Sequence, residues 1–295
     1  MNKRRPDVTV EIPVINEVTM MEEVEYLYHY TSIESLALIL KNKTIRLNPL
    51  DKMDDLQEQK TADVENLGKF VFVSSWTDDP TESIPMWKMY TNSTAGVRVK
   101  LRKNPFLWHG TYGANIEKVL GIPPQHDESR TKYVRTFLDL SKMMDGGYIS
   151  PQAWQGNILE KVTYTDDITK LEPKVATITN EGINLNTGIL GKYKNLHWAF
   201  QKEWRYIMQF ISVNFKASME DMANQAITSA NNMLQGTEPP PFRFFDLDID
   251  PRFFEEMEIT CSPQMTYGNR VILDTLIEKY NSKARIVESE LLGKL

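Results

Sequence analysis

Apolar stretches, alternating or continuous, predict four strands in the first third of the chain. They cover residues 26–30, 44–49, 70–76 and 96–101. The stretch 70–76 stays apolar until two serines interrupt it, which predicts a strand buried on both faces. The stretch 44–49 ends at Pro49, which cannot donate a backbone hydrogen bond to a continuing sheet. We therefore expect this part of the chain to be mainly β-sheet with short helices.

Helical spacing follows the first strand and recurs in later segments. Thr31 and Glu34 form a capping-box pattern, so a helix is expected to start there and to end near Lys43. Residues 85–90 fit a short helix with proline in its first turn. Further helices are predicted over 133–146, 192–200, 216–234 and 271–280.

One junction in the second half of the chain matters most for function. The segment 192–200 leads into 203–210, which alternates as a strand, and polar residues gather where the two meet. A loop is expected over 183–191. Other strands are predicted at 158–164, 244–249 and 284–287.

These elements predict one α+β domain spanning residues 1–295. Glycines and prolines repeatedly break residues 102–160, which are therefore expected to form an insertion. Residues 1–23 mix β-branched residues with Glu and Pro, which indicates an N-terminal arm.

Charge and composition narrow the class of protein. The 34 Lys and Arg residues against 40 Asp and Glu give a net charge of −6, which disfavours obligate binding of duplex DNA but leaves a local basic patch open. A single cysteine, Cys261, excludes an intramolecular disulfide. No metal site is expected, because the four histidines have no close His or Cys partner. With neither a secretory signal nor a membrane span in the sequence, we expect a cytoplasmic location and no membrane association.

Several common catalytic motifs are absent. The sequence has no G-x-G-x-x-G, no G-x-x-x-x-G-K-[ST], no G-x-S-x-G and no H-E-x-x-H. What remains is a set of polar residues at predicted strand ends, where chemistry is commonly placed. Each has an ordinary structural explanation, such as a core histidine or a cross-strand ion pair. The set is His29, Tyr30, Thr31, Ser74, Ser75, Tyr90, Gln201, Glu203 and Arg205.

Five motifs in this order resemble a widespread bacterial family long labelled as having no known function. The resemblance covers about residues 26–210, although the family favours Asn-Asp-Pro where this chain has Asp-Asp-Leu at 54–56. The motifs are Tyr-His-Tyr-Thr-Ser at 28–32, Met-Asp-Asp-Leu-Gln-Glu at 53–58, Ser-Ser-Trp at 74–76, Met-Trp-Lys-Met-Tyr at 86–90 and Glu-Trp-Arg at 203–205.

The same order also resembles the ADP-ribosyltransferase fold, which carries a histidine on its first strand and a Gln/Glu-x-Glu motif opening a late one. Gln201 and Glu203 match that motif. The resemblance implies a split β core with flanking helices, and NAD as the substrate. Glu203 would stabilise the oxocarbenium-like ribose. His29 would hold the adenosine-side ribose, and Thr31, two residues further along the same strand, would also contact the cofactor.

The resemblance also implies roles for the remaining residues. Tyr30 or Tyr90 would stack on the cationic nicotinamide ring. Ser74 and Ser75 would support Glu203 or the ribose. Arg205 has two interpretations, a contact with the NAD pyrophosphate or an ion pair with Glu58.

The expected function is therefore an NAD-dependent ADP-ribosyltransferase that modifies a nucleic acid or a protein. In such enzymes glutamate at the position of Gln201 accompanies arginine acceptors, so Gln201 points to another acceptor. A bacterial toxin or anti-phage effector with a neutralising partner is the expected setting. The alternatives are a non-catalytic nucleotide- or RNA-binding module, an NAD hydrolase, and a magnesium nuclease using Asp54, Asp55 and Glu58.

Three other features are expected to be structural. Trp87 and Trp204 are interpreted as packing residues whose indole N–H groups find a partner nearby. The aspartates at 246, 248 and 250 are interpreted as a solvated strand face, because no calcium-loop glycine accompanies them.

Overall fold

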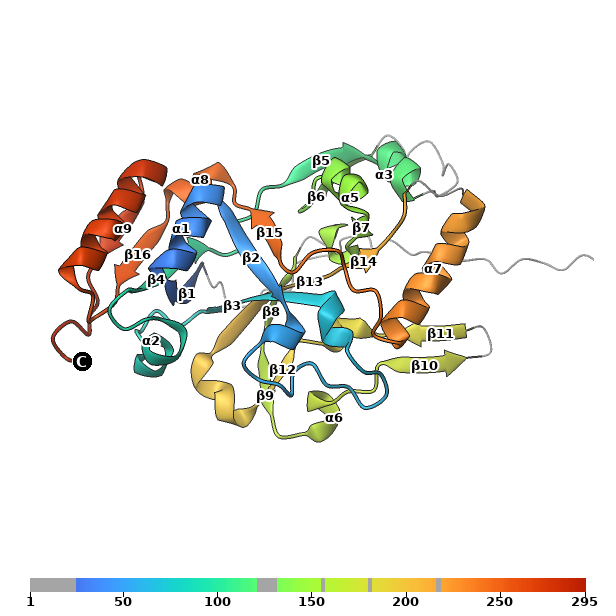
Figure 1. Ribbon diagram of the computed structural model, residues 1–295, viewed down its shortest axis with the longest axis horizontal. Helices are drawn as coiled ribbons and strands as arrows, with labels where there is room; N and C mark the ends of the chain where they lie inside the picture. Colours follow the sequence, from blue (N-terminus) through green and yellow to red (C-terminus); the bar gives the residue numbers. More distant parts are fainter. Residues whose placement is uncertain (1–24, 121–131, 155–156, 180–181, 216–218) are drawn as a thin grey trace, which may run out of the picture.

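The computed structural model describes residues 25–120, 132–154, 157–179, 182–215 and 219–295 (Figure 1). These residues form an α+β structure, as the sequence predicts. The predicted arm at 1–23 lies outside the described residues.

A nine-stranded mixed sheet forms the centre of the structure. Its strand order is β15-β2-β3-β1-β4-β16-β17, and β13 pairs with both β3 and β8. The strands are β1 (Tyr26–Ser32), β2 (Thr44–Pro49), β3 (Val71–Thr77), β4 (Gly96–Arg102), β8 (Leu159–Lys161), β13 (Glu203–Gln209), β15 (Phe245–Asp248), β16 (Glu258–Cys261) and β17 (Arg285–Val287).

The sheet is weakly joined at its middle. Strand β1 pairs with β4 along its whole length, from Tyr26 opposite Arg102 to Ser32 opposite Gly96. Its pairing with β3 consists of one position, Tyr28 opposite Thr77. The two parts of the sheet therefore separate beyond that position, and the gap between β1 and β3 becomes available to side chains.

Helices and small two-stranded sheets surround this centre. Helices α1 and α9 pack side by side at one end, and α7 lies at the other (Figure 1). The helices are α1 (Ile33–Asn42), α2 (Ile84–Tyr90), α3 (Gly113–Leu120), α5 (Leu140–Gly146), α6 (Ile168–Leu171), α7 (Met219–Leu234), α8 (Pro251–Glu255) and α9 (Tyr267–Tyr280). The small strands are β5 (His109–Tyr112), β6 (Tyr133–Thr136), β7 (Tyr148–Ile149), β9 (Thr163–Thr165), β10 (Ala176–Thr179), β11 (Gly182–Leu185), β12 (Tyr193–Asn195) and β14 (Ile211–Ser212).

The N-terminus of α1 differs from the predicted capping box by one residue. Ser32 is the N-cap, and its hydroxyl accepts a hydrogen bond from the backbone N–H of Ser35 at 3.2 Å. Thr31 stays in β1 because its backbone continues the pairing with β4, opposite Val97. This extension of the strand keeps Thr31 beside His29, at the end of the sheet.

Four other element predictions need correction. The predicted helix at 133–146 is the strand β6 followed by α5, because residues 133–136 pair with β5 and Asp139 caps the helix. The predicted strand at 158–164 is two short strands, β8 and β9. The predicted loop at 183–191 contains most of β11. The predicted helix at 192–200 is β12 followed by the 3₁₀ helix η5 (Leu196–Gln201).

Other predicted elements lie at or close to their expected ranges, but β16, which pairs with β4 in the main sheet, and helix α8 were not predicted. Strand β3 is buried on both faces, as its apolar run predicts. Helix α7 covers the described part of the predicted 216–234 helix, and residues 216–218 lie outside the described residues.

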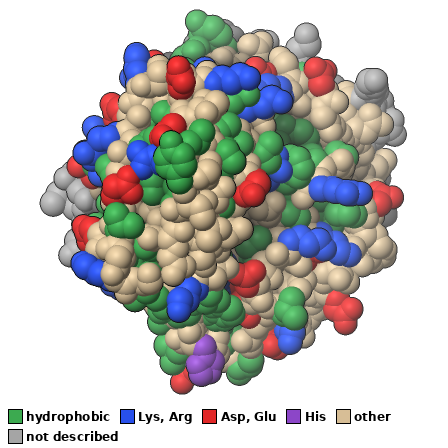
Figure 2. All heavy atoms as spheres, turned by 60° about the vertical axis from the view of Figure 1, so that its left-hand side comes forward, with side chains coloured by type: hydrophobic (Ala, Val, Ile, Leu, Met, Phe, Trp, Pro, Cys, Tyr) green, Lys and Arg blue, Asp and Glu red, His purple; other side chains and the backbone are tan. Residues whose placement is uncertain are grey.

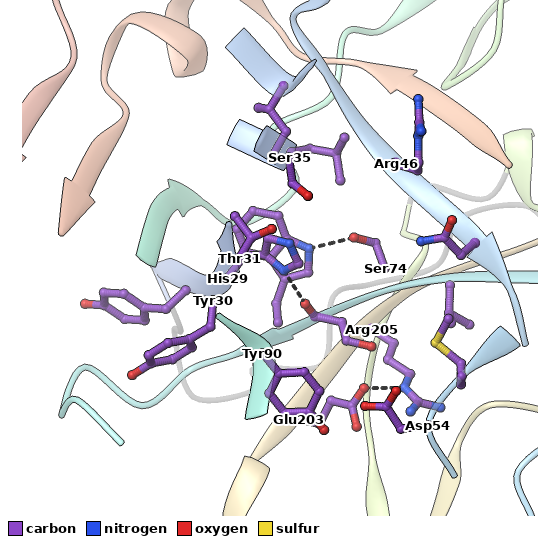
Figure 3. A pocket seen from close by; sticks show the side chains of 18 of the residues that line it. His29, Tyr30, Thr31, Ser35, Arg46, Asp54, Ser74, Tyr90, Glu203 and Arg205 are labelled. Carbon is purple, nitrogen blue, oxygen red and sulfur yellow. Dashed lines mark hydrogen bonds and ion pairs between the residues drawn. The ribbon is translucent and has the colours of Figure 1, made fainter. Parts of the chain in front are cut away.

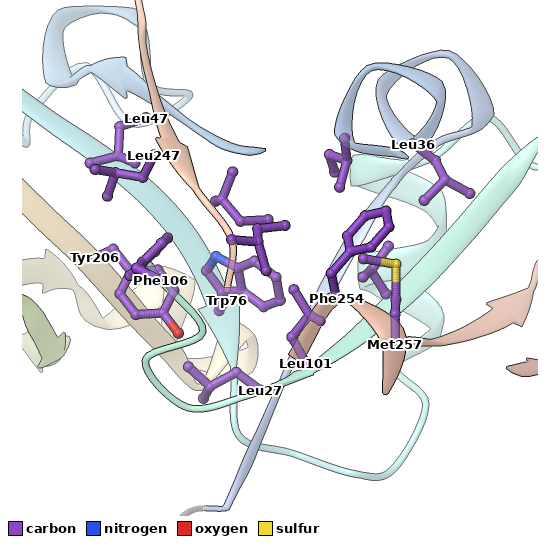
Figure 4. Close-up of a cluster of buried hydrophobic side chains, with 14 of the residues drawn as sticks. Leu27, Leu36, Leu47, Trp76, Leu101, Phe106, Tyr206, Leu247, Phe254 and Met257 are labelled. Atoms are coloured by element: carbon purple, nitrogen blue, oxygen red, sulfur yellow. The ribbon is translucent and has the colours of Figure 1, made fainter. Parts of the chain in front are cut away.

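The main hydrophobic core packs against the sheet and draws on distant parts of the chain. Figure 4 shows Phe106 beside Tyr206, whose rings are 4.6 Å apart between centroids in an edge-on arrangement. Phe137 and Tyr148 belong to the same buried cluster. The segment 102–160 therefore packs as part of the sheet's own core, while its status as an insertion stays a prediction.

Candidate functional site

A cavity of about 350 Å³ lies at the separation of β1 from β3. Helix α1, strand β2 and the end of α2 complete its walls. It brings together all nine residues singled out in the sequence, although they come from five separate elements. Figure 3 labels all of them except Ser75 and Gln201. A volume of this size suits a small-molecule ligand.

Three buried charged residues line this cavity, Lys194, Glu203 and Arg205, and a fourth, Glu58, pairs with two of them. Arg205 donates from Nε to Glu203 Oε1 at 2.6 Å and from both Nη atoms to Glu58. Lys194 Nζ lies 3.0 Å from Glu58 Oε1 and 3.2 Å from Glu203 Oε2. None of the four side chains is more than 5% exposed. Two carboxylates and two cations thus form a neutral charge quartet, Glu58, Lys194, Glu203 and Arg205.

The quartet keeps Glu203 ionised. Burial alone would raise the pKa of this carboxyl group, but the charges of Arg205 and Lys194 and hydrogen bonds from Arg205 and Ser75 lower it to about 2. The backbone also fixes the position of Glu203, because its N–H donates to the Tyr164 hydroxyl at 2.8 Å. The site therefore contains a carboxylate whose charge and position are both fixed by the protein.

Gln201 connects the quartet to α2. Its Oε1 accepts a hydrogen bond from Lys194 Nζ at 2.8 Å, and its Nε2 donates to the Tyr90 hydroxyl. Burial, with the neighbouring carboxylates of Asp54 and Glu203, raises the pKa of Tyr90, which stays protonated. Since both ends of its buried amide bind protein groups, Gln201 acts here as a positioning residue.

His29 lies next to this cluster on β1. Its Nδ1 is 2.8 Å from the carbonyl oxygen of Ser75, which can only accept, so Nδ1 carries the proton and Nε2 is an acceptor. The ring packs on Trp76 with 5.0 Å between centroids. Burial lowers the pKa of His29, so the ring is neutral at pH 7. His29 thus offers a ligand one fixed acceptor nitrogen.

The serines and Thr31 occupy different positions in the cavity wall. Ser74 accepts a hydrogen bond from Trp76 Nε1 at 3.1 Å and is committed to packing. Ser75 is the serine whose side chain bonds to Glu203. Thr31 is buried and lines the cavity beside His29.

Tyr30 is not placed for stacking on a ligand. Its side chain is 4% exposed, and its ring packs edge-on against Trp87 at 5.0 Å between centroids. Its hydroxyl accepts a hydrogen bond from the Ser83 N–H at 3.0 Å. Strand alternation explains the difference, because Tyr30 and His29 face opposite sides of β1. Of the two tyrosines expected to stack, Tyr90 is the one that faces Glu203 (Figure 3).

Arg205 pairs with Glu58, which decides between its two interpretations. Four of its five N–H bonds are occupied, by Glu203, twice by Glu58 and by the Gly191 carbonyl at 3.1 Å. With 1% of its side chain exposed, it has no pair of donors for a pyrophosphate. The predicted role of Arg205 in binding cofactor phosphate is therefore not supported.

Sequence reasoning missed Lys194 as a site residue. It lies on β12, and the 3₁₀ helix η5 then turns the chain so that Lys194 meets Gln201 and Glu203. The only sequence signal was a lysine seven residues before the Q-x-E-x-R pattern, and the helix predicted over 192–200 gave the wrong orientation for its side chain.

The residues interpreted as structural behave differently from one another. Trp87 is buried and donates to Glu82 at 2.9 Å, as expected. Trp204 is buried, but its Nε1 has no hydrogen-bond partner in the described structure, so that part of the prediction is wrong. The three aspartates do not form a simple solvated face, because each one forms an ion pair with an Arg or Lys side chain. The pairs are Asp246 with Arg46, Asp248 with Lys142 and Asp250 with Arg252.

Two other kinds of feature are absent from the described residues. These residues contain no group of three or more His, Cys, Asp or Glu side chains arranged to hold a metal ion, so Asp54, Asp55 and Glu58 do not form one. No helix among them is long and apolar enough to cross a membrane.

Comparison with known proteins identifies no relative of this chain. No protein-family model, no curated protein and no solved structure matches the chain.

Proposed function

We propose that this cavity binds NAD and that the protein transfers ADP-ribose to a macromolecular acceptor, a nucleic acid or a protein. In the setting that we propose, the protein is a cytoplasmic bacterial toxin or anti-phage effector held in check by a neutralising partner. The observation that carries the proposal is the ionised Glu203 beside a neutral His29 in one cavity. The single-position junction of β1 and β3 supports the resemblance to the split core of ADP-ribosyltransferases.

The proposed chemistry assigns roles to groups already in place. Nε2 of His29 accepts a hydrogen bond from a ribose hydroxyl and orients the dinucleotide. Glu203 accepts from a hydroxyl of the nicotinamide ribose and stabilises the positive charge that develops there. The bond between ribose C1′ and nicotinamide breaks, and its electron pair leaves with nicotinamide. The acceptor atom then bonds to C1′ and releases its proton.

Glu203 needs no rearrangement to play this part. A carboxylate oxygen accepts more than one hydrogen bond, so the contacts with Arg205 and Lys194 leave acceptor capacity on both oxygens. Because Gln201 is held by Lys194 and Tyr90, its effect on acceptor choice would come through their positions.

The surface offers limited support for a nucleic-acid acceptor. On the face viewed in Figure 2, basic and acidic side chains of the described residues are interspersed rather than gathered into a basic stripe. Nucleic acids bind strongly where Lys and Arg cluster. Both acceptor classes therefore enter the test.

One observation favours a second candidate, a non-catalytic nucleotide-binding module. Glu203 belongs to a closed neutral quartet, and a carboxylate in such a group can serve as a structural anchor. Binding without turnover is the outcome that distinguishes this candidate.

The experiment is to incubate the purified protein with NAD and cell extract, and to follow nicotinamide release and ADP-ribose incorporation. We expect both, with Glu203→Gln lowering the rate about 100-fold or more because the charge opposite the ribose is lost. Glu203→Asp keeps the charge of the quartet but moves the carboxylate, and should also be slow. Glu160→Gln is the matched control, since Glu160 lies on the neighbouring strand β8, pairs with Lys192 at the surface and lies outside the cavity.

Treating the labelled product with nuclease or protease identifies the acceptor class. Nicotinamide release without label would instead indicate an NAD hydrolase. NAD binding without release would favour the binding module, and no binding by a folded wild-type protein would contradict the proposal.

A further inference from the structure

The cavity has a second charged end, formed by Arg46. This residue lies on β2, where the alternating Ile45 and Leu47 are buried in the core. Arg46 lines the same cavity as Glu203. In Figure 3 the two residues lie at opposite sides of the view, with Ser74 between them. A ligand that reached both would need to be elongated.

Two contacts hold the Arg46 side chain in one place. Asp246 lies directly opposite on β15 and accepts from Nε at 2.8 Å and from Nη2 at 3.0 Å. The guanidinium carbon lies 3.4 Å from the centroid of the Phe244 ring. An arginine fixed in this way loses little side-chain freedom when it binds a ligand.

The Asp246 contact uses only one side of the guanidinium group. Both N–H bonds of Nη1 and the second N–H of Nη2 have no hydrogen-bond partner among the described residues. The Arg46 side chain is 34% exposed, so these donors are accessible. They form the fork that binds two oxygens of a phosphate.

Nearby charges indicate how an anion would be recognised. Asp54 and Asp246 also line the cavity, so its lining does not attract every negatively charged group. Recognition must therefore come from directed N–H bonds at Arg46 rather than from net positive charge. This favours a compact phosphate group over a long polyanion.

We propose that Arg46 binds the diphosphate of a dinucleotide whose reacting ribose lies at Glu203. This inference rests on the proposed function, and it gives Arg46 the phosphate contact that Arg205 cannot make. His29, which lines the same cavity, would hold the ribose between the two ends.

The test measures binding of ADP-ribose and of adenosine to wild type, Arg46→Gln and Arg252→Gln by calorimetry at physiological salt. Arg252 is a matched control, because it also donates from Nε and Nη2 to an aspartate, at 3.0 and 2.8 Å, and lies near a phenylalanine ring. It lies outside the cavity. We expect Arg46→Gln to weaken ADP-ribose about 10- to 100-fold while leaving adenosine unchanged, and Arg252→Gln to change neither.

A second variant separates the fork from the charge. Arg46→Lys keeps the positive charge without the planar fork, and should weaken ADP-ribose by an intermediate factor. Folding is expected to survive these changes, because the Asp246 side chain is 24% exposed and can be hydrated.

Two results would overturn the inference in different ways. In the first, wild type binds ADP-ribose and releases nicotinamide, but Arg46→Gln either keeps the wild-type affinity for ADP-ribose and adenosine or loses affinity for both by the same factor. Arg46 then does not bind phosphate, and the proposed function stands. If folded wild type binds neither ligand, the inference and the proposed function are both wrong.

Discussion

Replacing Lys194 by methionine is expected to lower the free energy of unfolding by about 3–5 kcal/mol. The Lys194 ammonium lies 3.0 Å from Glu58 and 3.2 Å from Glu203, and its side chain is 5% exposed. Without it the buried quartet carries one excess negative charge that water cannot reach. Methionine fills a similar volume, so the loss would reflect charge rather than packing. Denaturant-induced unfolding at pH 7 measures the change.

Two further variants make this result specific. Lys192→Met removes a neighbouring lysine that is 37% exposed and paired with the exposed Glu160, so it should cost less than about 1 kcal/mol. The double variant Lys194→Met, Glu203→Gln restores neutrality and should be more stable than the two single effects predict, by about 1–3 kcal/mol. Equal small losses for Lys192→Met and Lys194→Met would show that the four charges do not act as a unit.

The quartet connects stability to function through one residue. Glu203 is held by Arg205, Lys194 and the Tyr164 hydroxyl before any ligand arrives. A group oriented in advance pays no reorganisation cost during the reaction. In the proposed chemistry, the same contacts that make the quartet costly to break would fix Glu203 at the developing charge.

Alternation along strands predicted the parts of the site that lie on strands. The apolar run at 70–76 predicted the buried strand that carries Ser74 and Ser75, but β3 continues to Thr77, so the two serines lie within the strand and not at its end. Alternation at 203–210 placed Glu203 and Arg205 on one face, and that face binds Glu58 and Lys194. Local pattern suffices here because strand geometry fixes which side chains share a face.

Contacts between distant segments could not be predicted in this way. Arg46 and Asp246 are 200 residues apart in the chain, and neither sequence neighbourhood indicates the pairing of β2 with β15. Tyr30 lines the cavity beside His29, but the same alternation turns its ring toward Trp87 and away from a stacking position. Lys194 depends on a 3₁₀ turn that apolar spacing does not distinguish from an α-helix.

The pH dependence of stability provides the second large expected effect. Glu203 has a pKa lowered to about 2 in the folded protein, against an ordinary value of 4.5. A carboxyl group with a lowered folded pKa binds its proton more readily in the unfolded chain, so acid favours unfolding. The stabilisation is complete above about pH 5 and is lost as the pH falls from about 4.5 toward 2. A shift of this size corresponds to about 3 kcal/mol.

Unfolding free energies measured at several values between pH 7 and pH 3 test this expectation. The double variant Lys194→Met, Glu203→Gln lacks the titrating carboxyl group and keeps a neutral pair, Glu58 with Arg205. Its stability should therefore fall less steeply than that of wild type over the same range. Parallel profiles for the two proteins would mean that other carboxyl groups govern acid unfolding and that Glu203 is not held ionised by the quartet. A steeper wild-type profile would connect the lowered pKa of Glu203 to its contacts with Arg205 and Lys194, because Glu58, the other carboxylate that loses Lys194 in the variant, keeps both of its contacts with Arg205.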